Sequence, residues 1–415
     1  MEKERLDFKA ENPKLRPLDF QPVYYQNQQM WYLRDPLHLT DQQLIFPASM
    51  TPLLALLNGE QSIREIHASF CQHIGEAIDF TITVEALSRL DEACLLDNAR
   101  SHEAKERILA SYRAQPYRLP ALANHGYPED ADELSAYLDE FGEANRFEEA
   151  GSWQGRGIVS PHIDYDRGGA VYAKVWQRAA NALSDADLVL IFGTDHNGGA
   201  GTVTLTRKPY ATPYGIMETD VDLIDKLAAV LTPEAAYAEE LHHVREHSVE
   251  LSAVWMHHMV RRRGYSPPPM VPILVGSFHH FLVNGTHPGA DYRLIGFIDT
   301  LREETAGKRV LAVASVDLAH IGPNFGDSFT MDRQRRSDLK IQDKALMAAA
   351  VAGDSTGWYR LIADIGNRNR ICGFAPTYLL LRYLENQSGE AIAYKQCPAD
   401  AQDHSLVSIC GLLLD

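Results

Sequence analysis

From Arg156 onward, the chain alternates between short apolar runs and helical patterns, and this alternation constrains the fold more than any other feature. The apolar runs predict strands within 157–163, 187–199, 270–278, 309–327 and 404–414. Helical patterns lie between them, at 170–183, 246–260 and 373–384. Such alternation is typical of an α/β domain, in which helices cover both faces of a central mixed sheet. Ligand sites in these sheets lie in the loops at the carboxyl ends of strands.

The first part of the chain is predicted to be a small α+β unit. Aromatic and β-branched residues around a polar QNQQ turn predict two short strands within 22–36. Three short helical patterns follow, and Ser62 is a suitable N-cap for the second of them; the patterns lie at 51–57, 62–70 and 83–96. A charged connector, expected to be helical, leads to the α/β part. We therefore predict two domains, 1–114 and 115–415.

Net charge and cysteine usage indicate which binding partners and which cellular compartment the protein could have. The 415 residues carry a formal net charge of −17, which argues against a general nucleic-acid binder, because such proteins need a basic face. No stretch approaches the roughly 20 apolar residues of a membrane span, and the N-terminus lacks the apolar run of a signal peptide. The five cysteines are scattered, with no CxxC pair, which indicates a reducing compartment. We therefore expect a cytoplasmic protein that binds neither nucleic acid nor membrane.

Histidines and carboxylates occur at the ends of the predicted strands. His162, His196 and the Asp317–His320 segment each follow an apolar run, where an α/β fold builds its site. Cys372 precedes one helical pattern, and His247 begins another. Each residue alone also fits an ordinary structural role, as a loop histidine, a solvated helix face, a strand-end turn or a buried thiol. Together they predict a site that is assembled by folding.

The residue types at these positions are suited to a metal ion. Two imidazoles with a thiolate or a carboxylate can hold a divalent transition metal and leave coordination positions open. Imidazole suits iron, copper and zinc, and a thiolate shifts the preference toward softer ions. Asp317, His320, Glu246 and Asp164 could then supply outer hydrogen bonds or proton transfer. Other histidines without strand-end placement are predicted to be surface or packing residues, among them His242, His243, His257, His258, His279 and His280.

Several short segments carry a resemblance to a known family. They are SPHIDY, FGTDHNG, ATPYG, EHSVEL, VPILVGSF, SVDLAHIGP, ICGFAP and DHSLVSICGLLL, and they lie between Asn124 and Asp415. In this order they resemble the Memo family, and closely its bacterial branch, AmmeMemoRadiSam system protein B. The resemblance implies an α/β fold like that of the class III extradiol ring-cleaving dioxygenases.

The same resemblance implies roles for single residues. It implies a metal site of His162, His196 and Cys372, where Cys372 takes the place of the carboxylate that completes the iron site of the ring-cleaving enzymes. The family also has an Asp–His pair that supports its metal site, and this pair corresponds to Asp317 and His320. A further histidine, implied to line the same cleft, falls on His247.

The N-terminal part is similar to a second group of proteins. Its aromatic hairpin, the LRDP and NGEQSIREI segments and the LDEACLLD helix resemble the PqqD-like winged-helix modules. Those modules bind peptide leaders in peptide-modification systems. The resemblance therefore implies a winged-helix-like domain and a possible peptide ligand.

These observations lead to one functional hypothesis and two alternatives. We expect a metal-dependent redox enzyme, dioxygenase-like, that holds Fe(II) or copper and uses His247 and His320 for acid–base chemistry, with Asp317 orienting one of them. The family resemblance implies radical-SAM and Ammecr-type protein partners. One alternative is a zinc hydrolase, in which the metal activates water. The other is a non-enzymatic adaptor that binds a metal or a peptide.

Overall fold

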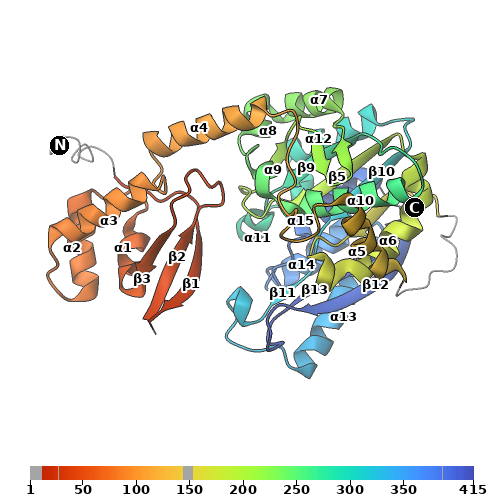
Figure 1. The fold of residues 1–415 in the computed structure, drawn as a ribbon. Coiled ribbons are helices and arrows are strands. Elements are labelled where there is room, and N and C mark those ends of the chain that lie inside the picture. The colour runs from red at the N-terminus through yellow and green to blue at the C-terminus, as the bar shows by residue number, and fades with distance from the viewer. Residues whose placement is uncertain (1–11, 27, 144–152, 386) are drawn as a thin grey trace. The chain divides into compact units, whose positions relative to one another are not determined.

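The computed structural model describes residues 12–26, 28–143, 153–385 and 387–415 (Figure 1). The chain divides into two compact units, Met1–Ala114 and Gln115–Asp415. Each unit has a hydrophobic core of its own. Within the described ranges, no helix combines the length and the apolar character that crossing a bilayer requires.

The first unit packs a small antiparallel sheet against helices. Its strands pair in chain order and are β1 (Asp19–Tyr25), β2 (Gln28–Arg34) and β3 (Leu44–Pro47). The helices that follow are η1 (Ala48–Met50), α1 (Thr51–Leu56), α2 (Ile63–Ile74), α3 (Phe80–Glu92) and α4 (Ala99–Ala114). Ser62 does cap α2, because its hydroxyl accepts from the Glu65 N–H while the Glu65 carboxylate accepts from the Ser62 N–H.

One strand of this sheet was not predicted from the sequence. The strand β3 has only four residues, of which two are buried, so its sequence offers too little alternation to be recognised. The predicted strands within 22–36 and the three predicted helices are present, with ends that differ by a few residues. Asn27, in the predicted turn, lies outside the described residues.

The second unit is built on an eight-stranded mixed sheet, which confirms the predicted sheet. Its order is β11-β13-β4-β10-β5-β9-β6, and β12 pairs with the free side of β13. The four central strands run parallel and are β4 (Gly157–Ser160), β10 (Val310–Ser315), β5 (Leu188–Thr194) and β9 (Met270–Val275). The outer strands are antiparallel to their neighbours and are β6 (Val203–Leu205), β11 (His320–Ile321), β12 (Gly389–Pro398) and β13 (Leu406–Leu414). A separate hairpin consists of β7 (Tyr210–Thr212) and β8 (Gly215–Met217).

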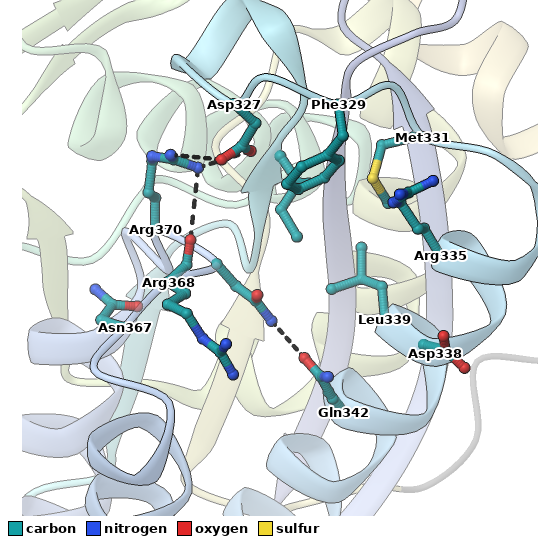
Figure 2. A pocket seen from close by; sticks show the side chains of 12 residues that line it. Asp327, Phe329, Met331, Arg335, Asp338, Leu339, Gln342, Asn367, Arg368 and Arg370 are labelled. Atoms are coloured by element: carbon teal, nitrogen blue, oxygen red, sulfur yellow. Dashed lines mark hydrogen bonds and ion pairs between the residues drawn. The ribbon is translucent and has the colours of Figure 1, made fainter.

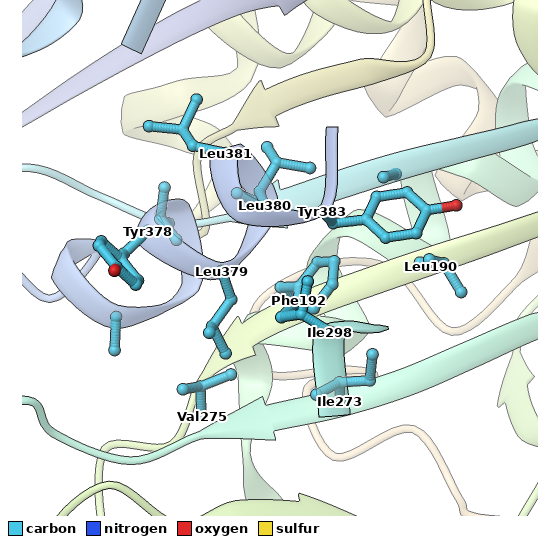
Figure 3. Close-up of a cluster of buried hydrophobic side chains, with 14 of the residues drawn as sticks. Leu190, Phe192, Ile273, Val275, Ile298, Tyr378, Leu379, Leu380, Leu381 and Tyr383 are labelled. Carbon is cyan, nitrogen blue, oxygen red and sulfur yellow. The ribbon is translucent and has the colours of Figure 1, made fainter. Parts of the chain in front are cut away.

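Helices cover both faces of this sheet, as predicted. All seven residues of β5 are buried, and successive side chains point to opposite faces. Val189 and Ile191 pack with the helices of one face, α5 (Ala131–Glu143), α6 (Tyr165–Asp185) and α10 (His247–Arg262). Leu190 and Phe192 pack on the other face beneath α15 (Phe374–Leu384), as Figure 3 shows. That face also holds α7 (Val221–Leu231), α12 (Tyr292–Glu304), α13 (Arg333–Val351) and α14 (Ser355–Asp364).

The remaining helical segments are short and lie in the connections of the second unit. They are α8 (Pro233–Tyr237), α9 (His242–Arg245), α11 (His279–Asn284), η2 (Pro288–Ala290) and η3 (Pro323–Phe325). The long helices occupy the two faces of the sheet. The polar side chains that follow the parallel strands therefore lie at the edge formed by the carboxyl ends of these strands.

Candidate metal centre

Three predicted site residues follow three neighbouring parallel strands. His162, His196 and Asp317 each lie two residues beyond a strand end, after β4, β5 and β10 respectively. These strands are adjacent and parallel, in the order β4-β10-β5, so their carboxyl ends meet at one edge of the sheet. The topology therefore brings together residues that are far apart in the sequence.

A cluster of three imidazoles forms at this edge. One nitrogen from each of His162, His196 and His247 lies within 4.8 Å of the others. The rings of His196 and His247 are stacked with centroids 4.9 Å apart, and the ring of His162 packs edge-on to both, at 5.0 and 5.2 Å. His247 is the first residue of α10, so the start of this helix closes the cluster.

Each imidazole is anchored through its Nδ1 atom. The Nδ1 atom of His162 lies 2.9 Å from the carbonyl oxygen of Ser315, and the Nδ1 atom of His196 lies 3.0 Å from Oε2 of Glu246. The Nδ1 atom of His247 lies 3.2 Å from Oε1 of the same carboxylate. Because these oxygens can only accept, each Nδ1 is the donor, so the lone pair of a ring in its neutral form is on Nε2. This is the tautomer of histidines that bind metals, whose other nitrogen donates to a carboxylate or a carbonyl. Burial opposes the charged form of His196, but the Glu246 carboxylate outweighs it and raises the pKa of His196 well above its usual value.

Glu246 is the buried carboxylate that organises two of these rings. Its oxygens also accept from the backbone N–H groups of His196 and Ser248, at 3.0 and 2.9 Å, and it is the N-cap of α10. Burial by itself would raise the pKa of Glu246, but the nearby charges of His196 and His247 outweigh it and hold the pKa well below the usual range. The carboxylate therefore stays ionised beside the imidazoles.

Cys372 lies against the same cluster. Its Sγ atom is 3.3 Å from Nε2 of His162, and its carbonyl accepts from the Thr194 hydroxyl at the end of β5. A Cβ atom on Gly373 would lie 2.7 Å from the carbonyl oxygen of Asp317, so only glycine allows this close approach. Burial raises the pKa of the Cys372 thiol, although His196 opposes the shift. A bound metal ion would favour the thiolate instead, since metals deprotonate coordinating thiols.

Asp317 contacts the backbone that carries His162. Its Oδ1 atom accepts from the N–H groups of His162 and Ile163, at 3.0 and 3.2 Å, and its Oδ2 atom is 3.8 Å from Nε2 of His162. Burial raises the pKa of Asp317 to about 6, with the two backbone hydrogen bonds opposing the shift. The hydrogen bonds described for Asp317 hold the His162 segment and do not orient the rings of His247 or His320.

His320 lies outside the group of converging nitrogens, as far as the described residues show. Its Nδ1 atom faces the carbonyl oxygens of Leu318 and Arg370, at 3.3 and 3.1 Å, and its ring packs edge-on against Phe325. Burial, followed by the charge of His196, lowers the pKa of His320 to about 4. The ring is therefore neutral at physiological pH, with its lone pair on Nε2.

A second group of ligand-type residues supports the loop that carries His196. The side chains of Asp195, Glu239 and His242 approach one another within 4.8 Å. His242 Nδ1 lies 2.8 Å from Asp195 Oδ2, and the Glu239 carboxylate accepts from the N–H of Gly199. The sequence indicated only a surface or packing role for His242, because it follows no predicted strand. Its contact with Asp195, the residue before His196, is visible only in the folded chain.

Comparisons with known proteins agree with the resemblance noted in the sequence. The family model described as Memo-like protein matches residues 118–413. A MEMO1 family protein of Aquifex aeolicus is 25% identical over 97% of this chain and 99% of the relative. A MEMO1 family protein of Methanosarcina acetivorans is 25% identical over 66% of this chain and 88% of the relative, and one of Methanococcus maripaludis is 22% identical over 65% and 88%. Since the family model covers nearly all of the second unit, this chain belongs to the Memo-like family.

Proposed function

We propose that the second unit binds one transition-metal ion, Fe(II) or copper, through His162, His196 and Cys372. The observation that carries the proposal is the convergence of the imidazoles, each of which is anchored at Nδ1 so that Nε2 is the nitrogen left to bind a metal ion. The Sγ atom of Cys372 lies against the same Nε2 atom of His162. Two imidazoles and one thiolate form a mixed ligand set that suits iron, copper or zinc and leaves positions open for a substrate.

The surrounding residues suggest how such a site would be used. A bound ion of this type would supply Lewis acidity and one-electron redox chemistry. His247 is our candidate for proton transfer at the cluster, because the Glu246 carboxylate orients its ring. The His196 side chain is 34% exposed, so the cluster is accessible from solvent. We therefore propose a metal-dependent redox enzyme of the dioxygenase-like kind.

A zinc hydrolase is the second candidate, because zinc also accepts two histidines and one cysteine with an open water position. Replacing Cys372 by aspartate separates the two functions. If the site is a redox centre, Cys372→Asp creates a two-histidine, one-carboxylate set that still binds Fe(II) but changes the rate of oxygen uptake. The measurement is oxygen consumption by anaerobically loaded protein, with Cys71→Asp in the first unit as the control.

Wild-type protein that consumes no oxygen and shows no redox activity with iron or copper would contradict the redox proposal. A Cys372→Asp variant that keeps zinc and a hydrolytic activity without any oxygen dependence would support the hydrolase. Metal binding with neither activity would support the non-enzymatic adaptor. The three functions therefore give different results in one set of assays.

A fragment that begins at Gln115 is expected to fold and to bind the metal ion with the affinity of the full chain. The reason is that all the clustered residues lie in the second unit, which has its own core. Circular dichroism and a metal titration of residues 115–415 would check this. A folded fragment without metal affinity would show that the first unit completes the site.

Partners and location also belong to the proposal. The Memo-family resemblance supports cooperation with radical-SAM and Ammecr-type proteins, and the scattered cysteines support a cytoplasmic location. The separate PqqD-like resemblance of the first unit supports a winged-helix-like, peptide-binding role for that unit. Among the described residues, strand β1 of that unit pairs only with β2, and Tyr24 and Tyr25 are 77% and 65% exposed. Co-purification of a radical-SAM protein with the full chain, and its loss on deleting residues 1–114, would test this part of the proposal.

A further inference from the structure

A pocket separate from the metal cluster opens beside β11. Its volume is about 470 Å³, and its walls come from β11, the segment between η3 and α13, the first turns of α13 and the loop that follows α14 (Figure 2). This volume falls within the roughly 300–1,000 Å³ of small-molecule sites. No residue of the metal cluster lines it.

Three arginines and two aspartates line the polar part of this pocket. Arg370 is held by Asp327 through two hydrogen bonds of 2.8 and 3.0 Å, so this pair is close to neutral. Arg335 is paired with Asp332 and lies over the ring of Phe329 at 5.0 Å. The remaining carboxylate of the lining, Asp338, is exposed and accepts from the side chain of Gln334.

Arg368 differs from the other two arginines of this wall. Within the part of the chain that the structure describes, its guanidinium group has no hydrogen-bond or ion-pair partner. A free guanidinium group carries five N–H donors in a planar fork that matches a carboxylate or a phosphate group. Figure 2 shows Arg368 and Arg370 on one side of the pocket, opposite Phe329 and Leu339. An anion in the pocket would therefore meet donors that no protein group occupies.

The opposite wall of the pocket is apolar. It is formed by Ile321, Phe329, Met331 and Leu339. Met331 and Leu339 are buried, whereas the ring of Phe329 is 38% exposed and available to a ligand. A ligand with an apolar body could cover this ring and release the water around it. The two walls thus favour a molecule that is apolar at one end and anionic at the other.

The loop that carries Arg368 is held in an unusual conformation. Asn367 and Arg370 both have a φ of 49°, in the left-handed region that non-glycine residues seldom adopt. The Asn367 side chain accepts from the N–H of Ile371, which fixes the turn. Backbone strain of this kind persists at binding and active sites, where it holds side chains in place before a ligand arrives. The loop continues directly into Cys372.

We propose that this pocket binds a small organic anion that joins a carboxylate or phosphate group to an aromatic or aliphatic body. Arg368 receives the anionic group, and the wall formed by Phe329 and Leu339 receives the body. The proposal is independent of the metal site, because it uses none of the cluster residues.

Calorimetric titration of the metal-free full chain at fixed ionic strength tests this proposal. The probes are phenyl phosphate, benzoate and inorganic phosphate. Phenyl phosphate or benzoate should bind more tightly than inorganic phosphate, and which of the two is tighter tells whether the natural ligand carries a phosphate or a carboxylate group. Metal-free protein removes any binding of phosphate to a metal ion, so failure here leaves the metal proposal untouched.

Two variants and one control locate the binding. Arg368→Gln should weaken phenyl phosphate binding by about tenfold, as expected for loss of a charge-assisted hydrogen bond. Phe329→Ala should remove the preference for phenyl phosphate over inorganic phosphate. Arg333→Gln, an exposed position on α13 that does not line the pocket, makes the same charge change and should leave binding unaltered. Equal affinity of the Arg368→Gln variant and the wild type, or equal weakening by Arg333→Gln, would overturn the proposal.

Discussion

Alanine at His162 or at His196 is expected to abolish tight binding of a transition-metal ion. Each substitution removes an imidazole from the cluster, so the loss of affinity should exceed the roughly 10- to 100-fold that follows the loss of an outer hydrogen-bonding partner. Titration of metal-free protein under anaerobic conditions measures the affinity, and circular dichroism checks that each variant is folded. The partly exposed position of His196 makes its variant the safer of the two for folding.

His279→Ala is the matched control for these variants. His279 is an exposed histidine at the start of α11, remote in sequence from the cluster residues, and the group of converging nitrogens does not include it. Its substitution should leave both the affinity and the stoichiometry unchanged. Full metal occupancy in both the His162→Ala and the His196→Ala variants would mean that the ion is held elsewhere.

Alanine at Glu250 is expected to lower the free energy of unfolding by about 3–5 kcal/mol, the cost of removing one partner of a buried ion pair. The side chains of Arg118 and Glu250 are 0% and 1% exposed, and they form an ion pair. Glu250 also accepts from the Tyr127 hydroxyl and from the backbone N–H groups of Ala121 and Leu122. Removal of the Glu250 carboxylate leaves the buried charge of Arg118 without its ion-pair partner. Denaturant unfolding of the full chain would measure the change.

The effect of this substitution should extend to the metal cluster. Arg118 donates to the backbone carbonyls of His243 and Glu246, so the segment before α10 depends on the same ion pair. Asp132→Ala is the control, because Asp132 is 92% exposed and its pair with Arg261 is solvated, so its loss should change stability little. Equal unfolding free energies for Glu250→Ala and the wild type would show that the buried network does not stabilise the unit.

Much of the sheet could be predicted from the sequence, and the reason is local. Strands such as β5 and β10 are buried on both faces, so they appear as unbroken apolar runs that end in polar loops. The order of the strands was beyond prediction, because it depends on pairing between distant segments. The last strand, β13, pairs with β12 along one side and with β11 and β4 at the two ends of its other side, and it runs antiparallel to all three, which the run LVSICGLLL does not indicate.

The candidate site, too, could be predicted from the sequence only in part. The positions of His162, His196 and Asp317 follow from strand ends, so the sequence indicated that they would share one edge of the sheet. The stacking of His247 on His196, and the single carboxylate of Glu246 that holds both rings, depend on how α10 crosses that edge. Helix placement is a matter of tertiary packing, and no local pattern encodes it.

X-ray absorption spectroscopy of the iron-loaded, anaerobically prepared full chain tests the central claim most directly. We predict about one ion per chain, with imidazole nitrogens and one sulfur neighbour at roughly 2.3 Å, the distance found in cysteine-bound metal sites. The sulfur neighbour should disappear in the Cys372→Asp variant while the imidazole neighbours remain. A chain that retains no stoichiometric ion, or a spectrum without imidazole and sulfur neighbours, would contradict the account.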